Sequence, residues 1–418
     1  IGALAFGAFA VFWLAGLVAA ERLSAAGREV VLLEASPKAG GRCRSYRDDR
    51  LGRMIDNGNH LILSANRAVL GWADRIGGRD ALHVGDAAYP FLDVGSGERW
   101  TIRPGRGPFG AITSAARPPG VSLTALAGDM TRLLTAGRGR TVEGAVGRGP
   151  AWDAFWDPMT RAVLNEAPEV GSAALLRAAL LRSFAKGAAA AKPVFAPDGL
   201  GAALIEPALA TLERRGVIPR LRQAVTALDG GVRLDAIGAG GERHDLGPDD
   251  VAVLALPPRQ TADLLPEIAF PEPGRAILNA HFLAPESALP PLLALVGGQA
   301  HWLFRRGDVV SVTVSAAEAS SVGTADRVAA LDVLWHDVST AIRAHGGRVP
   351  NAMPAARLLR ERAATFDQSP AGVAARHGPR TRWPNLFLAG DHVDTGLPAT
   401  LEGAVRSGVT AADLALGA

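Results

Sequence analysis

The sequence predicts an α/β protein whose parallel sheet is built from both ends of the chain, with a helical region and a mixed sheet-and-helix domain inserted between them. Three observations predict this fold. An apolar helical pattern near the N-terminus is followed by the strand pattern Glu29–Glu34, a buried strand pattern at 250–256 ends at two prolines, and residues 385–416 read as strand, glycine-rich loop and helix. With 418 residues, the chain has room for two or three domains that share an interface.

The N-terminal segment has two interpretations. Residues 1–20 carry no charge, and about 20 apolar residues are enough to span a bilayer, so an anchor or signal segment is one of them. No basic run precedes the apolar stretch, however, and it continues into 21–27, which is typical of an amphipathic helix end with a glycine after it. We therefore expect strand, turn, helix and strand in the first 34 residues.

A carboxylate ends the second of these strands. Glu34 follows Gly16 by 18 residues, and a carboxylate at this place can accept hydrogen bonds from the ribose hydroxyls of an adenine dinucleotide. The alternative is a surface acid at a strand end. Gly40, Gly41 and Arg42 come next and offer backbone amides and a guanidinium to a pyrophosphate or a flavin.

The glycine fingerprint that normally precedes such a carboxylate is incomplete. Gly16 matches the third glycine of G-x-G-x-x-G, but Val11 and Trp13 stand where the first two belong. A side chain at the second position would occupy the space through which the backbone approaches the pyrophosphate. Three explanations are open: an N-terminus that departs from the natural one, another register of the loop, or a lost cofactor site.

The middle of the chain predicts the inserted regions. Residues 104–150 are rich in Gly, Pro, Arg and Ala, and helical patterns cover 123–136 and 174–184. Short strand signals lie at 217–227 and 231–235, whereas 259–351 combines alternating stretches with a helix over 325–345. We expect the dinucleotide-binding domain in three parts and two insertions, bounded as 1–100, 101–215 (helical and substrate region), 216–258, 259–380 (substrate domain) and 381–418.

The C-terminal motif is the strongest signal. A strand leads into Gly390 and Asp391, then into a loop with Leu397, Pro398 and Ala399, and finally into a helix with a small-residue face. An aspartate here can hold ribityl or phosphate-bridging groups, and the helix N-terminus directs its amides at the isoalloxazine or a phosphate. The alternative is a surface loop before a packing helix.

Composition narrows the functional classes. Apolar residues make up 48% and charged residues 20% of the chain, whose net charge is +3. No basic run is interleaved with aromatic residues, which argues against nucleic-acid binding. Cys43 is the single cysteine, so an intramolecular disulfide and a multi-cysteine metal site are excluded, and we expect no metal.

These motifs resemble a known family. Residues 34–45, 55–61, 253–258 and 386–408 are similar to FAD-dependent desaturase-type oxidoreductases of the amine oxidase and phytoene desaturase superfamily, and 56–61 with 394–400 most resemble its squalene-associated branch, hydroxysqualene dehydroxylase. The resemblance implies a Rossmann-like FAD-binding domain with an inserted substrate domain. It also implies FAD bound by Gly16, Glu34, Gly40, Gly41, Arg42, Gly58, Gly390, Asp391, Leu397, Pro398 and Ala399.

The implied reaction is the reduction of hydroxysqualene to squalene in bacterial hopanoid or related triterpene synthesis. Protonation of the allylic hydroxyl lets water leave, and reduced flavin then donates hydride. Asp56, His60, Asp391, His392 and Asp394 are the candidate acids, and we select His60 and Asp394. The hydrophobic C30 isoprenoid substrate implies a dry apolar tunnel and a cytoplasmic enzyme in peripheral contact with the inner membrane.

Two other functions are consistent with the sequence. A polyene desaturase of the phytoene type would run hydride transfer from substrate to oxidised flavin on the same fold. A flavin-free, membrane-associated isoprenoid-binding protein would follow if Trp13 blocks the cofactor. Amine oxidation is disfavoured, because Tyr46 and Tyr89 are the sole tyrosines available for a paired-tyrosine cage. The oligomeric state is left open.

Overall fold

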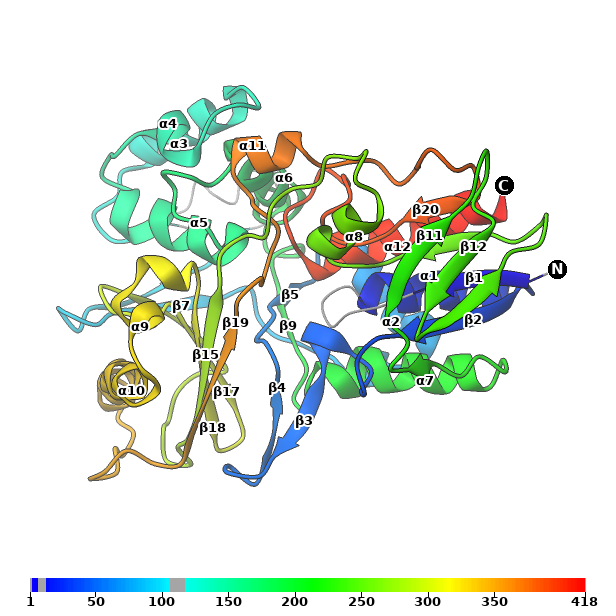
Figure 1. Ribbon diagram of the computed structural model, residues 1–418. Coiled ribbons are helices and arrows are strands. Elements are labelled where there is room, and N and C mark those ends of the chain that lie inside the picture. The colour runs from blue at the N-terminus through cyan, green and yellow to red at the C-terminus, as the bar shows by residue number, and fades with distance from the viewer. Residues whose placement is uncertain (1, 7–12, 106–116, 418) are drawn as a thin grey trace.

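Both ends of the chain run into one parallel sheet, on the right of Figure 1. The structure is a computed structural model that describes residues 2–6, 13–105 and 117–417. Its strands in this sheet lie in the order β10 (Arg220–Leu221), β2 (Glu29–Glu34), β1 (Gly2–Phe6), β14 (Ala252–Leu254), β20 (Leu386–Leu388). Neighbouring strands are all parallel, which confirms the α/β fold class.

The expected strand, helix and strand are present at the N-terminus as β1, α1 (Trp13–Ala25) and β2. The loop between β1 and α1, which includes Val11, lies outside the described residues. In the part of the chain that the structure describes, no helix is both long and apolar enough to cross a membrane.

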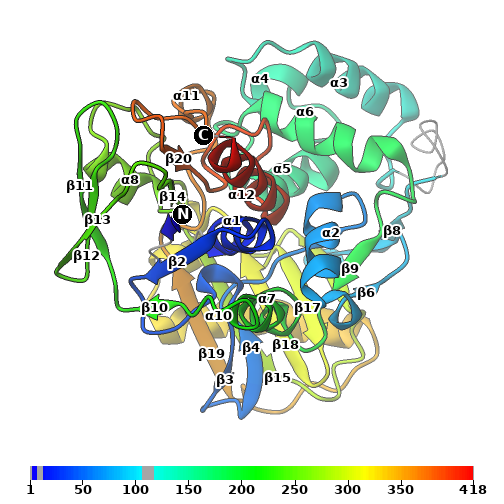
Figure 2. The same cartoon turned by 90° about the vertical axis from the view of Figure 1, so that its right-hand side faces the viewer.

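Two layers cover the parallel sheet. Helices α1, α2 (Arg67–Ile76), α7 (Glu206–Glu213) and α12 (Leu401–Leu416) pack on one face. On the other face lies an antiparallel sheet of β11 (Val225–Asp229), β12 (Ala236–Ala239) and β13 (Glu242–Asp245), whose Ile237 and Ala239 share a core with Leu254 and Leu388. Figure 2 shows the two layers on either side of β2 and β14.

The first and last helices of the chain cross at a glycine. A Cβ atom added at Gly408 of α12 would lie 2.4 Å from the Ala15 carbonyl oxygen and 3.0 Å from Val18 Cβ, both in α1. The small residues of α12 therefore let the two helices approach at backbone distance.

A second sheet lies at the lower left of Figure 1. Its described strands have the order β19 (Ala356–Glu361), β15 (Ile277–Leu283), β18 (Val309–Val314), β17 (Trp302–Arg306), β16 (Leu292–Val296), β7 (Tyr89–Asp93), β8 (Arg99–Ile102). Because side chains alternate along a strand, Leu278, Ala280 and Phe282 pack under α10 (Arg327–Ala344), while Asn279 of the same strand lies on the opposite face, where it lines a cavity.

A helical region packs beside the second sheet. It contains α3 (Leu123–Thr135), α4 (Val142–Val146), the π-helical turn η5 (Trp152–Trp156), α5 (Asp157–Leu164) and α6 (Ala173–Arg182). Trp156 is fully buried in its core, and its indole Nε1 donates to Asp129 Oδ2 at 2.8 Å. This aromatic residue is thus part of the core, as its helical spacing predicts.

Three details differ from the sequence-based expectations. Strands β7 and β8, within or across the expected 1–100 boundary, belong to the second sheet. The chain returns to the dinucleotide-binding part at η7 (Gly201–Ile205), before the expected residue 216. Residues 231–235 form the connection between β11 and β12 instead of a strand.

The other short elements are η1 (Gly41–Cys43), β3 (Ser45–Asp48), β4 (Arg53–Asp56), β5 (Ile62–Leu63), η2 (Arg79–Ala81), β6 (His83–Val84), η6 (Phe184–Lys186), β9 (Pro193–Phe195), α8 (Pro258–Leu264), η8 (Ala317–Ala319), α9 (Ser321–Thr324) and α11 (Pro370–Ala374).

Candidate active site

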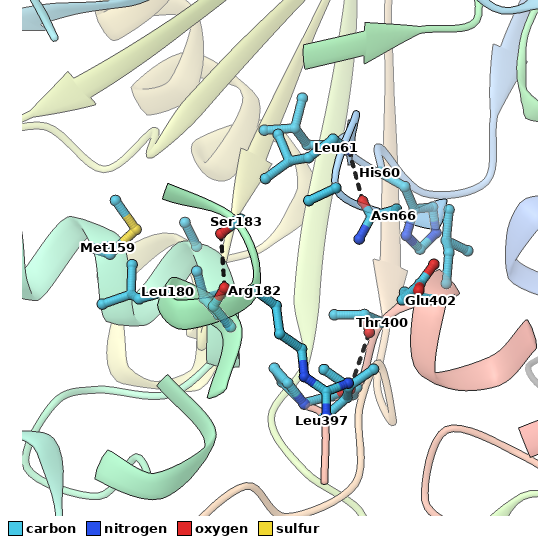
Figure 3. A pocket seen from close by; sticks show the side chains of 18 of the residues that line it. His60, Leu61, Asn66, Met159, Leu180, Arg182, Ser183, Leu397, Thr400 and Glu402 are labelled. Carbon is cyan, nitrogen blue, oxygen red and sulfur yellow. Dashed lines mark hydrogen bonds between the residues drawn. The ribbon is translucent and has the colours of Figure 1, made fainter. Parts of the chain in front are cut away.

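A cavity of about 930 Å³ lies where the parallel sheet, the second sheet and the helical region meet. Figure 3 shows part of its wall, with His60 and Glu402 in one part and Met159 and Leu180 in another. Polar groups including Arg42, Asn57 and Asp391 surround one part of it. The helical region and η6 contribute apolar side chains, namely Leu126, Met130, Leu133, Phe155, Met159, Val163, Leu180 and Phe184. The cavity therefore offers a polar end and an apolar arm, at the upper end of the usual size of about 300–1,000 Å³ for small-molecule sites.

Glu34 ends β2 and is fully buried. Its Oε1 accepts a hydrogen bond from the Ser36 amide at 2.5 Å. A buried carboxylate needs polar partners, since burial of a charge is otherwise costly. The structure thus holds the carboxylate at the carboxyl end of an inner strand of the parallel sheet, and ligands of open α/β sheets bind at this end of the strands.

The glycines after β2 form a tight turn. Gly40 has a φ of 106° and Gly41 a φ of 52°, both in the left-handed region that favours glycine. An added Cβ at Gly40 would lie 3.2 Å from Ile205 Cγ2 and from Arg44 Cβ. Both the backbone conformation and the lack of space therefore favour glycine at position 40. Gly41 begins η1, which places Arg42 in the cavity wall.

Arg42 and Asp391 join the two ends of the chain. Arg42 Nη2 lies 3.2 Å from Asp391 Oδ2, and both side chains are largely buried. Burial raises the pKa of the Asp391 carboxyl, and the charges of Arg42 and Arg376 oppose that shift. Asp391 Oδ1 is buried and has no hydrogen-bond partner among the described residues, so it is available to a ligand hydroxyl.

Arg376 holds the loop that follows Asp391. Its buried guanidinium donates to the carbonyl oxygens of Asp391 (3.0 Å), His392 (3.1 Å), Val393 (2.7 Å) and Leu397 (2.8 Å). These four bonds fix the backbone of 391–397. No local sequence pattern predicts this contact. The sequence analysis missed Arg376, because its partners lie 15 to 21 residues further on and are backbone atoms.

The loop leads into the N-terminus of α12. The Gly390 amide donates to Ser407 Oγ at 2.9 Å, and Gly390 has a φ of 144°. Thr400 caps α12 by accepting from the Gly403 amide at 3.1 Å. Leu397, Pro398 and Ala399 line the cavity just before this cap. Six of the expected cofactor residues line the cavity, namely Arg42, Gly58, Asp391, Leu397, Pro398 and Ala399. Gly16, Glu34, Gly40, Gly41 and Gly390 are not among the described residues that line it.

Gly16 lies in α1, where it is buried. Trp13 is the first residue of α1, and Val11 lies outside the described residues. The positions of the first two fingerprint glycines therefore fall at or before the start of the helix.

His60 lines the cavity beside Gly58. Burial, and next the charge of Arg42, lower the pKa of the His60 imidazole to about 4, while a hydrogen bond with the Arg42 backbone opposes the shift. The ring is therefore neutral at pH 7. Its Nε2 is buried without a partner among the described residues, and an added Cβ at Gly58 would lie 3.4 Å from this nitrogen.

Asp394 lies apart from His60. Its side chain is 54% exposed, 3.6 Å from Arg376 Nη1, and it accepts a hydrogen bond from the Gly396 amide at 2.9 Å. It borders a smaller surface pocket and is not among the described residues that line the large cavity. The structure therefore does not bring the two selected acids together. Of the other candidates, Asp56 accepts from Ser45 and Arg306 and is not among the described residues that line the cavity.

A network of three polar side chains lies on the cavity face of the second sheet. Asn59 Nδ2 donates to Asn279 Oδ1 at 3.2 Å and to Thr313 Oγ1 at 3.0 Å, and the Thr313 hydroxyl donates to Asn279 Oδ1 at 3.0 Å. We call these three residues the polar trio. Among the described residues Asn279 Nδ2 has no partner, so it can donate to a ligand oxygen. The sequence analysis missed Asn279 and Thr313, which become neighbours through the register of β15 with β18.

The remaining nucleophilic and metal-binding possibilities are limited. Cys43 is buried, and burial raises the pKa of its thiol to about 12, so the thiolate is not accessible at pH 7. Within the described ranges, no group of three or more His, Cys, Asp or Glu side chains is placed to hold a metal ion.

Comparison with known proteins places these features in a family. Residues 14–416 match the flavin-containing amine oxidoreductases. Hydroxysqualene dehydroxylase of Rhodopseudomonas palustris is 41% identical over 413 residues, 97% of each chain. The protein of the same name from Sinorhizobium fredii is 40% identical over 96% of each chain, and that from Zymomonas mobilis is 35% identical over 96% of this chain and 97% of its own.

Solved structures share the fold at lower identity. Cyclohexylamine oxidase from Brevibacterium oxydans superposes with a TM-score of 0.73 at 13% identity, covering 100% of this chain and 99% of its own. Putrescine oxidase bound to putrescine gives a TM-score of 0.66 at 15% identity with the same coverage. At this identity the likeness concerns the fold alone.

Proposed function

The chain belongs to the family of flavin-containing amine oxidoreductases, and from this membership we propose that it reduces hydroxysqualene to squalene. It is an FAD-dependent oxidoreductase. The observation that carries the choice of substrate is the cavity, which is lined both by apolar side chains of the helical region and by the polar trio, together with near full-length relatives that bear the dehydroxylase name. A C30 polyene with one hydroxyl has the same distribution of apolar and polar surface.

The described residues fit FAD. The buried carboxylate of Glu34 suits the ribose hydroxyls of the adenosine half. Arg42 supplies positive charge, Asp391 Oδ1 can accept a hydrogen bond from the ribityl chain, and the capped N-terminus of α12 directs amides at the same place. When bound and reduced, FAD supplies the hydride that replaces the leaving hydroxyl.

We propose that the polar trio holds the substrate hydroxyl. Asn279 Nδ2 donates to the hydroxyl oxygen, while Asn59 and Thr313 fix the orientation of the Asn279 amide through its Oδ1. A donor on this oxygen favours cleavage of the allylic C–O bond, because negative charge develops there as the bond breaks. The apolar walls keep water away from the resulting allylic cation.

His60 is the better supported of the two predicted acids. It lines the cavity, and its Nε2 has no partner among the residues described, whereas Asp394 is half exposed and turned to another pocket. Because the pKa of His60 is about 4, its ring is neutral at pH 7 and acts as a relay: one ring nitrogen takes up a proton that solvent supplies while the other donates its proton to the leaving oxygen. The oxygen then leaves as water.

The experiment that tests the reaction is an anaerobic turnover. Purified protein should show flavin absorbance, and after chemical reduction it should convert hydroxysqualene to squalene. Desaturation of a polyene by the oxidised protein, with no squalene formed, would favour a desaturase. Colourless protein that fails to take up FAD would favour the binding-protein alternative.

A water-insoluble substrate implies a location at a lipid surface. We propose that the protein works in the cytoplasm, in peripheral contact with the inner membrane. Support comes from the hydrophobic substrate and from the exposed apolar side chains that border the cavity.

A further inference from the structure

The exposed side chains that line the cavity show where it opens. Most of them lie at the C-terminal ends of α3 and α6 and in η6, including Leu134, Leu181, Arg182 and Lys186. Leu134 is 42% exposed and Leu181 is 45% exposed. Large apolar side chains with so much exposure at the rim of an apolar cavity are typical of a surface that another apolar phase covers.

One arginine places these two helix ends side by side. Arg177 Nη1 of α6 donates to the carbonyl oxygens of Leu134 (3.1 Å) and Ala136 (2.7 Å) at the end of α3. Arg177 therefore caps α3, since the last carbonyls of a helix lack partners within it. Leu181 lies one turn after Arg177 on α6, so the two exposed leucines border the same opening.

The two segments whose helix ends border the opening carry mainly positive charge. Residues 117–141 and 172–192 contain eight cations and a single acid, Asp129. Asp129 is buried and paired with Arg132, so it adds no negative charge to the surface. Arg138, Arg140, Arg182 and Lys186 are exposed. We call Leu134, Leu181 and these four cations the opening face.

We propose that the opening face docks on an anionic phospholipid bilayer, so that substrate passes from the lipid phase into the apolar arm without crossing water. The inference rests on the proposed function in one respect, namely that the substrate is a lipid-soluble isoprenoid. Leucines enter the headgroup boundary while cations contact lipid phosphates, which is the physical basis of interfacial binding. The four cations of the opening face favour an anionic bilayer over a protein partner whose surface is apolar and uncharged.

The test is vesicle co-sedimentation of the purified, flavin-loaded protein. Vesicles of phosphatidylglycerol and phosphatidylethanolamine should bind it, binding should fall with added salt, and phosphatidylcholine vesicles should bind it much less. Because each surface cation contributes roughly 1 kcal/mol near an anionic membrane and 1.4 kcal/mol is tenfold, Arg138→Glu with Arg140→Glu should weaken binding by about thirty-fold or more. Leu134→Asp with Leu181→Asp should weaken it as well.

Matched controls come from apolar residues exposed elsewhere. Ile218 is 69% exposed and Val232 is 92% exposed, and neither lies in the helical region, so Ile218→Asp with Val232→Asp should leave vesicle binding unchanged. Equal losses in both double variants would overturn the assignment to this face. Equal flavin content and far-ultraviolet circular dichroism in all variants excludes misfolding as the cause.

The two proposals fail separately. Neither Arg138 nor Arg140 is among the described residues that line the cavity, so the arginine variant should keep full turnover of detergent-dispersed hydroxysqualene and lose turnover of vesicle-borne substrate. If wild-type protein turns over dispersed substrate but does not bind anionic vesicles, the docking proposal is wrong and the proposed function stands. If the wild-type protein binds anionic vesicles but does not turn over hydroxysqualene in either form, the proposed function is wrong and the docking proposal stands.

Discussion

At the scale of single residues, the site depends on polar groups that the cavity leaves with unused hydrogen-bonding capacity. His60 Nε2 is a buried atom without a partner in the described part of the chain, and the buried side chain of Asn279 is held through its Oδ1. Buried polar groups usually form hydrogen bonds within the protein, so a buried group without a protein partner is a candidate for contact with water, an ion or a ligand. Their position at the cavity makes them the direct tests of substrate recognition.

We predict that Asn279→Leu weakens binding of hydroxysqualene but not of squalene. Loss of a hydrogen bond to a buried oxygen costs about 1–3 kcal/mol, or roughly 5- to 150-fold in affinity. Thr313→Ser retains the hydroxyl that orients Asn279 and should bind both ligands as wild type does. Displacement of a fluorescent isoprenoid measures both affinities, and equal weakening of both ligands would contradict the role of the trio.

A second prediction at this scale concerns Arg376. A lysine cannot reproduce the planar set of donors that reaches four carbonyl oxygens, so Arg376→Lys should loosen 391–397. We expect a stability loss of about 2–4 kcal/mol and FAD released on gel filtration, since several charge-assisted bonds are lost. The comparison variant is Arg382→Lys, an exposed residue paired with Glu267, which should retain flavin and stability.

At the scale of elements, the close packing of α1 against α12 holds the first and last parts of the parallel-sheet domain together. Sequence patterns predicted both helices and the strand Glu29–Glu34 correctly, because their periodicity is local. They did not predict that β7 joins the second sheet, since its partner β16 comes some two hundred residues later, in the register of Phe91 with Ala294. Asn279 and Thr313 escaped notice for the same reason, as no local pattern encodes a cross-strand pair.

The close approach at Gly408 gives a prediction for these elements. Gly408→Ala should destabilise the protein by about 1–3 kcal/mol, because the new methyl group would lie 2.4 Å from the Ala15 carbonyl oxygen and must push the helices apart. Gly71→Ala in α2, where nothing lies within 4 Å of the new Cβ, should instead stabilise by up to about 1 kcal/mol. Urea unfolding of both variants measures the sign, and a stabilised Gly408→Ala would mean that the helices are further apart than described.

At the scale of the whole molecule, buried histidines determine how stability depends on pH. Burial lowers the pKa of His60 and His301 to about 4 and that of His281 and His392 to about 3. The unfolded chain therefore binds more protons than the folded one below about pH 6.5, so stability is complete above that pH and falls as the pH is lowered. Three buried carboxyls act in the opposite direction to the four imidazoles: burial raises the pKa of Glu166 to about 7 and also raises the pKa of Asp56 and of Asp391.

We accordingly predict a lower urea midpoint at pH 5 than at pH 7.5, with a slope of at least the roughly 1.4 kcal/mol per pH unit that one titrating group contributes. His281→Asn replaces a buried imidazole that does not line the cavity, and it should reduce the slope of stability against pH. The midpoint of this variant at pH 7.5 measures the separate effect of the lost hydrogen bond to Ser311. A midpoint that is flat or rises towards pH 5 would show that these rings are protonated in the folded state.

The pairing of Arg42 with Asp391 sets an order of events during synthesis. The two residues are 349 positions apart, and a ribosome that adds about 5–20 residues per second needs roughly 20–70 s to travel between them. Throughout that interval the first βαβ unit has neither β20 beside β14 nor α12 across α1. Assembly of the nucleotide pocket must therefore wait until residue 391 and α12 have been synthesised, and a nascent chain that stalls before residue 391 exposes the apolar faces of α1 and β14 to chaperones and proteases.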